Sequence, residues 1–167
     1  LKTANPAISK ILVDALEATR ATPHVIYASS IHEDGESIYG KSKQIAGDII
    51  ERWATNANAD FTRILLPHIY SELVRPDYNS VIATFCRDIA NGKQPKQFKE
   101  GELHPLHASE VCKLIDEIIS NASSPTVVRN ISMPWLVSDI LEDIRRMRDL
   151  YLEQLVIPDL RDSRQLY

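Results

Sequence analysis

Three residues in the first third of the chain could together transfer a proton: Ser30, Tyr39 and Lys43. A free phenol has a pKa of about 10 and is a poor acid or base at neutral pH. A nearby ammonium group stabilises the phenolate, so a lysine four residues after a tyrosine on one helix face suits this chemistry. A serine hydroxyl could then hold the reacting oxygen of a substrate while the tyrosine exchanges a proton with it. A tyrosine–lysine pair at this spacing is also an ordinary half-exposed helix pair, and the pair alone leaves both interpretations open.

A strand, a loop and a helix must position these residues. Residues 25–27 are an apolar, β-prone run that leads directly into Ser29 and Ser30. Isoleucines recur at helical spacing after Tyr39, at positions 45, 49 and 50. We therefore predict a buried strand that ends at the two serines, and a helix that begins near Tyr39 and runs through Trp53.

The rest of the chain alternates strand and helix patterns. Residues 61–66 form a second β-prone run, closed by Pro67. A strand, a helix and a strand in this order predict two parallel strands joined by a right-handed crossover. Ligands bind at the carboxyl ends of such strands, where Ser30 and His68 fall. Helices are predicted at 7–18, 81–90, 111–119 and 135–155, a short strand at 126–131 and a charged surface loop at 93–101.

The double serine and the run Tyr39-Gly40-Lys41-Ser42-Lys43 resemble the extended branch of the short-chain dehydrogenase/reductase superfamily, the NAD-dependent epimerase/dehydratase family. The resemblance implies that Ser30 holds the substrate, that Tyr39 is the acid/base, and that Lys43 tunes Tyr39 and binds the nicotinamide ribose. It further implies cofactor contacts from Pro67, His68 and Ile69. The substrate contacts that it implies are Ser30, His68, Arg75, Tyr78 and Asn79.

Residues 65–71, Leu-Leu-Pro-His-Ile-Tyr-Ser, resemble the segment that this branch usually writes Arg-x-Pro-Asn-Val-(Phe/Tyr)-Gly. Residues 75–86 resemble most the reductase domain of the bacterial capsular-polysaccharide enzymes that make UDP-N-acetyl-L-fucosamine precursors. Four positions depart from the branch, namely Leu65, His68, Ser71 and Ile38, which stands where a proline is common before the tyrosine. They affect cofactor and substrate contacts, because a leucine cannot supply the charged fork of an arginine.

The resemblance implies an NAD(P)-dependent sugar-nucleotide oxidoreductase that reduces a UDP-4-keto-6-deoxy-N-acetylhexosamine in capsular polysaccharide or surface glycan synthesis, with Tyr39 as proton donor. The cofactor is NADP or NAD, with NADPH favoured by the resemblance. A sugar-nucleotide epimerase or dehydratase of the same branch is one alternative. A catalytically inactive fragment that acts as a structural or oligomerisation module is another.

Composition excludes several other classes of protein. The 167 residues are 44% hydrophobic and 25% charged, as in an ordinary globular domain. A net charge of −4 without a basic patch argues against nucleic acid, and no apolar run approaches the roughly 20 residues that cross a bilayer. Cys86 and Cys112 lie in apolar helical patterns and are predicted to be buried free thiols. We expect a soluble cytoplasmic protein, and no metal site, because His104 and His107 have no complementary ligand set.

The predicted fold is α/β: the later portion of a Rossmann-like doubly wound parallel sheet with a small, mostly helical substrate-binding part. Residues 1–66 are assigned to the Rossmann-like portion with the catalytic motif, and residues 67–167 mainly to the substrate-binding portion. None of the five glycines lies in a GxGxxG pattern, so the N-terminal dinucleotide-binding half is expected to be absent from the sequence. The chain alone is then expected neither to bind NADPH tightly nor to reduce a sugar nucleotide. A homodimer through the helix that carries Tyr39 is predicted, with a UDP-sugar as substrate.

Overall fold

The computed structural model describes residues 4–95, 100–121, 127–129 and 132–157. The chain forms two compact units. The first unit contains residues 1–67 and 112–131, and the second contains residues 68–111 and 132–167. The residues with predicted acid/base chemistry therefore all belong to the first unit.

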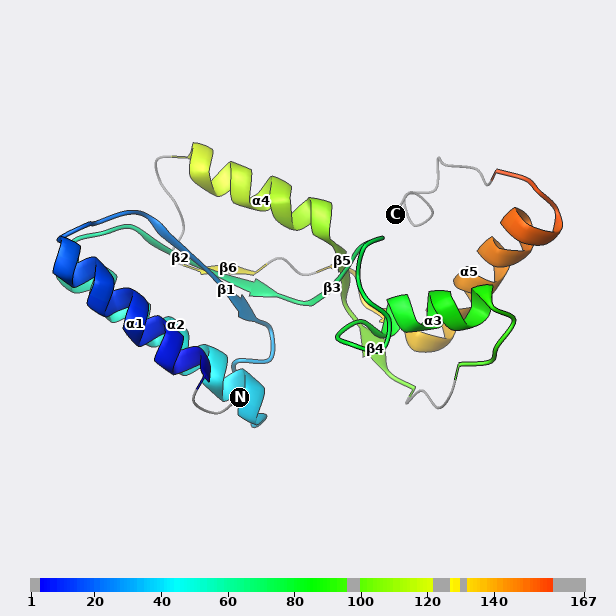
Figure 1. Cartoon of the computed structure of the whole chain (residues 1–167), viewed down its shortest axis with the longest axis horizontal. Coiled ribbons are helices and arrows are strands. Elements are labelled where there is room, and N and C mark those ends of the chain that lie inside the picture. The colour runs from blue at the N-terminus through cyan, green and yellow to red at the C-terminus, as the bar shows by residue number, and fades with distance from the viewer. Residues whose placement is uncertain (1–3, 96–99, 122–126, 130–131, 158–167) are drawn as a thin grey trace. The chain divides into compact units, whose positions relative to one another are not determined.

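A three-stranded parallel sheet organises the first unit (Figure 1). Its strands are β1 (Val25–Ser30), β2 (Phe61–Leu66) and β6 (Val127–Arg129), with β2 in the centre. β1 and β2 pair from Val25 opposite Phe61 to Ser30 opposite Leu66. The two strands therefore end at the same edge of the sheet, which is where the sequence predicts a ligand site.

Two helices cover one face of this sheet. Helix α2 (Ile38–Ala57) contacts β1 and β2, and α1 (Ala4–Thr19) packs along α2. Helix α4 (Ala108–Ser120), which enters this unit at Cys112, lies on the other side of the sheet (Figure 1). Helices on both faces are the arrangement of a doubly wound sheet. The core of the layer beneath α2 consists of Ile50, Trp53, Ala54 and Phe61.

The second unit is built from two short strand pairs and two helices. β3 (His68–Tyr70) pairs in parallel with β5 (Pro105–His107), and β4 (Glu102–Leu103) pairs antiparallel with β7 (Trp135–Leu136). Helices α3 (Val81–Ala90) and α5 (Val137–Arg148) pack against each other around a core of Phe85, Ile89, Val137 and Leu141. Helix is the main regular structure here, as the sequence predicts.

The predicted α/β fold is confirmed, and so is the parallel strand, helix, strand order of β1, α2 and β2. The predicted helix at 135–155 is wrong at both ends, because Trp135 and Leu136 pair with β4 and the α-helix ends at Arg148, followed by a π-helical turn, η1 (Asp149–Glu153). The predicted strand at 126–131 is confirmed for residues 127–129. Part of this strand, part of the loop predicted at 93–101, and the last ten residues lie outside the described residues.

The prediction of buried thiols is also wrong. Cys86 and Cys112 are both unpaired and exposed. Each lies on a strongly amphipathic helix that buries only one stripe of side chains, and the cysteines fall outside that stripe. Among the described residues, no helix is both long enough and apolar enough to cross a membrane.

Candidate functional site

The two serines at the end of β1 have different partners. Ser29 donates its hydroxyl hydrogen to the carboxylate of Glu33. Ser30 Oγ instead accepts the backbone N–H of His32 at 3.2 Å. A hydroxyl can donate one hydrogen as well as accept, and the contact with His32 leaves the donor of Ser30 unused. Ser30, which the sequence assigns to the substrate, is therefore the serine with a hydrogen to offer.

Gly40 explains why a glycine follows the tyrosine of the motif. A Cβ atom at this position would lie 1.9 Å from the carbonyl oxygen of His32, which is backbone and cannot move aside. The first turn of α2 therefore approaches the loop after β1 more closely than any other residue type allows. Ser37 caps the same turn by accepting the N–H of Gly40 at 2.9 Å. These contacts fix the start of the helix one residue before Tyr39.

Tyr39 and Lys43 lie on α2 beside the end of β1. Tyr39 is 44% exposed, so its phenol is open to a ligand. The Lys43 ammonium donates to the carbonyl oxygen of Ala28 at 2.9 Å, two residues before Ser30. Burial lowers the pKa of Lys43. An ammonium has three donors, and the contact with Ala28 uses one of them.

Tyr27 is a second tyrosine next to Lys43, and the sequence analysis did not assign it a role. Its ring centroid lies 5.4 Å from the Lys43 ammonium, and its hydroxyl donates to the Lys43 carbonyl at 3.0 Å. Burial raises the pKa of Tyr27 to about 12, an effect that the charge of Arg63 opposes and that of Glu33 increases. Tyr27 therefore stays protonated at neutral pH and holds α2 to β1, whereas the exposed Tyr39 is the phenol available for chemistry.

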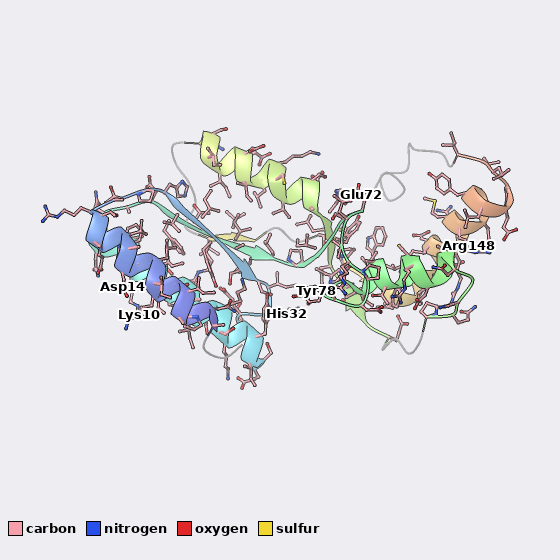
Figure 2. The ribbon with its side chains drawn as sticks, viewed as in Figure 1. Lys10, Asp14, His32, Glu72, Tyr78 and Arg148 are labelled. Atoms are coloured by element: carbon pink, nitrogen blue, oxygen red, sulfur yellow. The ribbon has the colours of Figure 1, made fainter. Side chains whose placement is uncertain are left out.

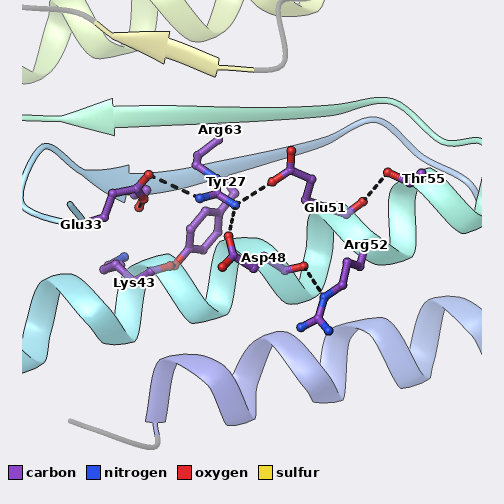
Figure 3. Close-up of polar contacts among 9 residues, drawn as sticks. Tyr27, Glu33, Lys43, Asp48, Glu51, Arg52, Thr55 and Arg63 are labelled. Atoms are coloured by element: carbon purple, nitrogen blue, oxygen red, sulfur yellow. Dashed lines mark hydrogen bonds and ion pairs between the residues drawn. The ribbon is translucent and has the colours of Figure 1, made fainter.

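A buried arginine joins three carboxylates beneath this site (Figure 3). Arg63, on the central strand, is 6% exposed. It donates to Glu33 at 3.3 Å, Asp48 at 2.7 Å and Glu51 at 2.8 Å. Burial acts to lower the pKa of the guanidinium, but the hydrogen bond to Asp48 and the charge of Glu33 outweigh burial and raise the pKa, so the group remains charged. The only sequence signal for this network is a charged residue inside the apolar run 61–66.

The other predicted site residues belong mainly to the second unit. Pro67 ends the first unit, and His68 and Ile69 form the start of β3. Burial lowers the pKa of His68, whose Nε2 lies 3.4 Å from Ser80 Oγ. Arg75, Tyr78 and Asn79 are exposed in the loop before α3, and the side chain of Tyr78 is labelled in Figure 2.

An ion pair and a hydrogen bond hold this loop against α3. Asp77 has the left-handed backbone conformation, with φ 61°, and its carboxylate pairs with the guanidinium of Arg87. The backbone N–H of Asp77 donates to Thr84 Oγ1 at 2.9 Å. The loop is therefore tied to α3 at the residue between Arg75 and Tyr78.

The histidines predicted to be structural have hydrogen-bond partners. His104 Nδ1 lies 3.0 Å from the carbonyl oxygen of Ser132, and His107 Nδ1 lies 2.8 Å from Ser109 Oγ. Within the part of the chain that the structure describes, no three histidine, cysteine or carboxylate side chains gather closely enough to hold a metal ion.

The fold is that of Rossmann-like UDP-sugar epimerases and reductases. A UDP-glucose 4-epimerase from Thermus thermophilus, solved as a complex with NAD, has a TM-score of 0.71 and 11% identity, covering 84% of this chain and 52% of that chain. The capsular polysaccharide assembling protein CapF from Staphylococcus aureus has a TM-score of 0.81 and 21% identity, covering 95% of this chain and 45% of that chain. At these identities the likeness concerns the fold.

One curated protein is similar in sequence. The UDP-2-acetamido-2,6-beta-L-arabino-hexul-4-ose reductase of Pseudomonas aeruginosa is 28% identical over 88 residues, which are 53% of this chain and 24% of that protein. No protein-family model matches the sequence. The chain thus spans about half the length of the solved relatives and about a quarter of the curated one.

The residues of the first unit fit the nicotinamide ribose end of a dinucleotide. Lys43 keeps donors that ribose hydroxyls accept, and Tyr39 is exposed on the same helix. The pyrophosphate end normally meets a glycine-rich turn, and the 167 residues contain no such motif.

Proposed function

We propose that this chain carries the acid/base site of an NAD(P)-dependent sugar-nucleotide oxidoreductase. The observation that carries the proposal is that exposed Tyr39 and Lys43 lie on one helix, which packs against the parallel strand that ends at Ser30, with the Lys43 ammonium bound to the Ala28 carbonyl of that strand. The substrate we propose is a UDP-4-keto-6-deoxy-N-acetylhexosamine, used in capsular polysaccharide or surface glycan synthesis. The names of the curated reductase and of CapF support this choice.

In the proposed reaction a ketone becomes an alcohol. The hydride that adds to the carbonyl carbon would come from a nicotinamide dinucleotide when one is bound. Tyr39 gives its phenolic proton to the carbonyl oxygen, and Ser30 donates a hydrogen bond to the same oxygen. Lys43 stabilises the phenolate that remains on Tyr39, because an adjacent positive charge favours the anion. Such general acid catalysis contributes about 10²–10⁴-fold to the rate.

Residues of the second unit take the binding roles that the family resemblance implies. We assign cofactor contacts to Pro67, His68 and Ile69. Arg75, Tyr78 and Asn79 are assigned to the UDP-sugar, as is His68. The exposure of the three loop residues supports this assignment, because an exposed guanidinium can pair with a diphosphate and an exposed phenol ring can pack on a base or sugar.

An epimerase or dehydratase is the second candidate, favoured by the likeness to the Thermus thermophilus UDP-glucose 4-epimerase fold. The same tyrosine could serve either reaction. A reductase consumes one reduced cofactor for each sugar converted, whereas an epimerase or a dehydratase consumes none overall. The departures at Leu65, His68 and Ser71 favour a third candidate, an inactive structural module.

The deciding experiment uses the protein at its full natural length, because the 167 residues alone are expected to bind the cofactor weakly. It incubates that protein with the UDP-4-keto sugar and either NADH or NADPH, and follows cofactor absorbance together with the sugar product. We expect equal amounts of oxidised cofactor and 4-hydroxy sugar. A parallel incubation offers a UDP-N-acetylhexosamine that still has its 4- and 6-hydroxyl groups, together with NAD. Conversion of that sugar without net change of the cofactor would indicate an epimerase or a dehydratase, and conversion of neither sugar would favour the structural module. The solved relative holds NAD, so comparing the two cofactors also tests the NADPH preference.

We also propose a homodimer and a cytoplasmic location. Several apolar side chains of α1 and α2 are exposed, and a second copy of the chain could cover them: Ile8, Ile11, Leu12 and Ile45. Sedimentation should give a defined dimer at micromolar concentration, and Ile45→Glu should shift it toward monomer. A monomeric wild-type protein would refute the dimer.

A further inference from the structure

The Arg63 network connects the loop that follows β1 to helix α2. On the loop side, Glu33 is 5% exposed and accepts hydrogen bonds from Ser29 and from Arg63. The backbone N–H of Glu33 also donates to the carbonyl oxygen of Ser30 at 3.0 Å. The Ser30 backbone is therefore hydrogen-bonded to the backbone of the residue whose carboxylate binds Ser29 and Arg63.

On the helix side, α2 provides both the carboxylate partners of the Arg63 guanidinium and the space that it occupies. Arg63 binds Asp48 and Glu51, which are one turn apart and lie further along the helix than Lys43. Next to Asp48, Gly47 faces the guanidinium, and a Cβ atom there would lie 2.8 Å from Arg63 Cζ. An alanine at 47 would push the guanidinium away from its partners, because contacts below 3.0 Å require a shift. The fork of an arginine fits this space, whereas a lysine offers one point of contact in place of a planar group.

Stability alone is a weak explanation for such a network. Burying charges costs desolvation energy, and well-packed apolar residues often stabilise a protein as well or better. The rest of β2 is mostly apolar and almost fully buried, so an apolar residue at 63 would suit the strand. What an ionic network adds is fixed geometry, because the two terminal guanidinium nitrogens of Arg63 must meet particular carboxylate oxygens.

We propose that Arg63 and Glu33 are positioning residues, which hold the Ser30 loop at a set distance from Tyr39 and Lys43 on α2. The chain of contacts runs from the backbone of Ser30 through Glu33 and Arg63 to Asp48 and Glu51. Neither residue touches the reacting atoms. The inference rests on the proposed function, in which Ser30 and Tyr39 bind the same carbonyl oxygen and tolerate little error in their separation.

The test compares Glu33→Gln, Arg63→Lys and Arg63→Met with wild type. Arg52→Met is the matched control, since Arg52 donates to a backbone carbonyl of α2 and is exposed, outside the buried network. In folded Glu33→Gln and Arg63→Met we expect kcat to fall about 10²-fold, as for a misplaced catalytic group, with the Kd for NADH changed by less than about twofold. Arg63→Lys should have a kcat little higher than that of Arg63→Met. Arg52→Met should behave as wild type.

Amide hydrogen exchange supplies a readout that does not depend on activity. Residues 31–36 should exchange faster in Glu33→Gln and Arg63→Met, while α1 and the last turns of α2 keep wild-type rates. If Arg63→Met fails to fold, the nearly isosteric Glu33→Gln carries the test. Wild-type kcat in folded variants would overturn the proposal, even if exchange were faster. If wild type itself reduces no sugar nucleotide, the proposed function fails, and unchanged exchange in the variants would separately overturn the positioning role.

Discussion

The polar residues assigned to the site differ in burial between the two units. In the first, the groups around the acid/base pair are buried and connected, from Ser29 through Glu33 to Arg63. In the second, three of the residues assigned to the substrate, Arg75, Tyr78 and Asn79, lie on an exposed loop, and Tyr78 is 74% exposed. A buried network holds a geometry before any ligand arrives, whereas exposed side chains are ordered by the ligand at an entropic cost. Variants of the first unit should therefore act on kcat, and variants of the second on KM.

The largest effect is expected for Tyr39→Phe. Loss of the phenolic proton should lower kcat by about 10²–10⁴-fold. The neighbouring phenol, Tyr27, is a poor substitute as a proton donor, because burial raises its pKa to about 12 and its hydroxyl already donates to the Lys43 carbonyl. The Kd for NADH, measured by fluorescence titration, should change little. Tyr151→Phe is the matched control, since Tyr151 is 46% exposed and lies on η1 in the other unit. Wild-type turnover in Tyr39→Phe would end the proposed mechanism.

Lys43→Ala should have the next largest effect, and it should weaken cofactor binding as well as turnover. The substitution removes the ammonium proposed to stabilise the Tyr39 phenolate and also the donors proposed for the ribose. We therefore expect kcat to fall and the Kd for NADH to rise, each by about tenfold or more. Calorimetric titration with NADH separates the two losses. Lys41→Ala is the control, because Lys41 is an exposed lysine that pairs with exposed Glu36. An unchanged Kd in Lys43→Ala would remove the ribose role.

In the second unit, Arg75→Gln should raise KM for the UDP-sugar by about tenfold and leave kcat close to wild type. A charge-assisted hydrogen bond to a diphosphate contributes about 1.5–3 kcal/mol, which is at least tenfold in affinity. Steady-state kinetics at several sugar concentrations gives the two constants. Arg146→Gln is the control, with an exposed arginine that pairs within α5. A fall in kcat at constant KM would contradict the division of roles between the units.

The sequence predicts well what short-range patterns encode. The succession of β1, α2 and β2 follows from two apolar runs and an intervening helical period, and the tyrosine, lysine and serine of the site lie within that one stretch. Pairs such as Trp135–Leu136 with Glu102–Leu103 are too short to show any period, so their strands were not predicted. The predicted start of the helix at 135–155 therefore lies before the start of the observed helix.

The Arg63 network could not be read from the sequence, because its members come from the loop after β1, from α2 and from β2. A single arginine among apolar residues does not indicate which carboxylates it meets. The thiols show the same limit, since an apolar helix segment does not reveal which stripe it buries, and Cys86 and Cys112 proved to be exposed. Contacts between segments that are distant in the sequence can be identified only once the fold is known.

The smallest effect concerns pH and belongs to His68 in the second unit. Burial lowers the pKa of His68 below the ordinary value of about 6.5. As pH falls through that value, the unfolded chain gains a proton at His68 before the folded chain does. The free energy of unfolding therefore falls with pH in this window, by at most about 1.4 kcal/mol per pH unit for one proton, and the loss stops below the folded pKa.

His68→Gln should remove this part of the pH dependence. Urea unfolding measured from about pH 5 to about pH 8 should give a flatter stability profile below about pH 6.5 for the variant than for wild type. His32→Gln, at an exposed histidine of the first unit, controls for the loss of an imidazole. Parallel profiles for wild type and His68→Gln would show that burial does not hold His68 neutral. That result would contradict the inference that the His68 imidazole is shielded from water.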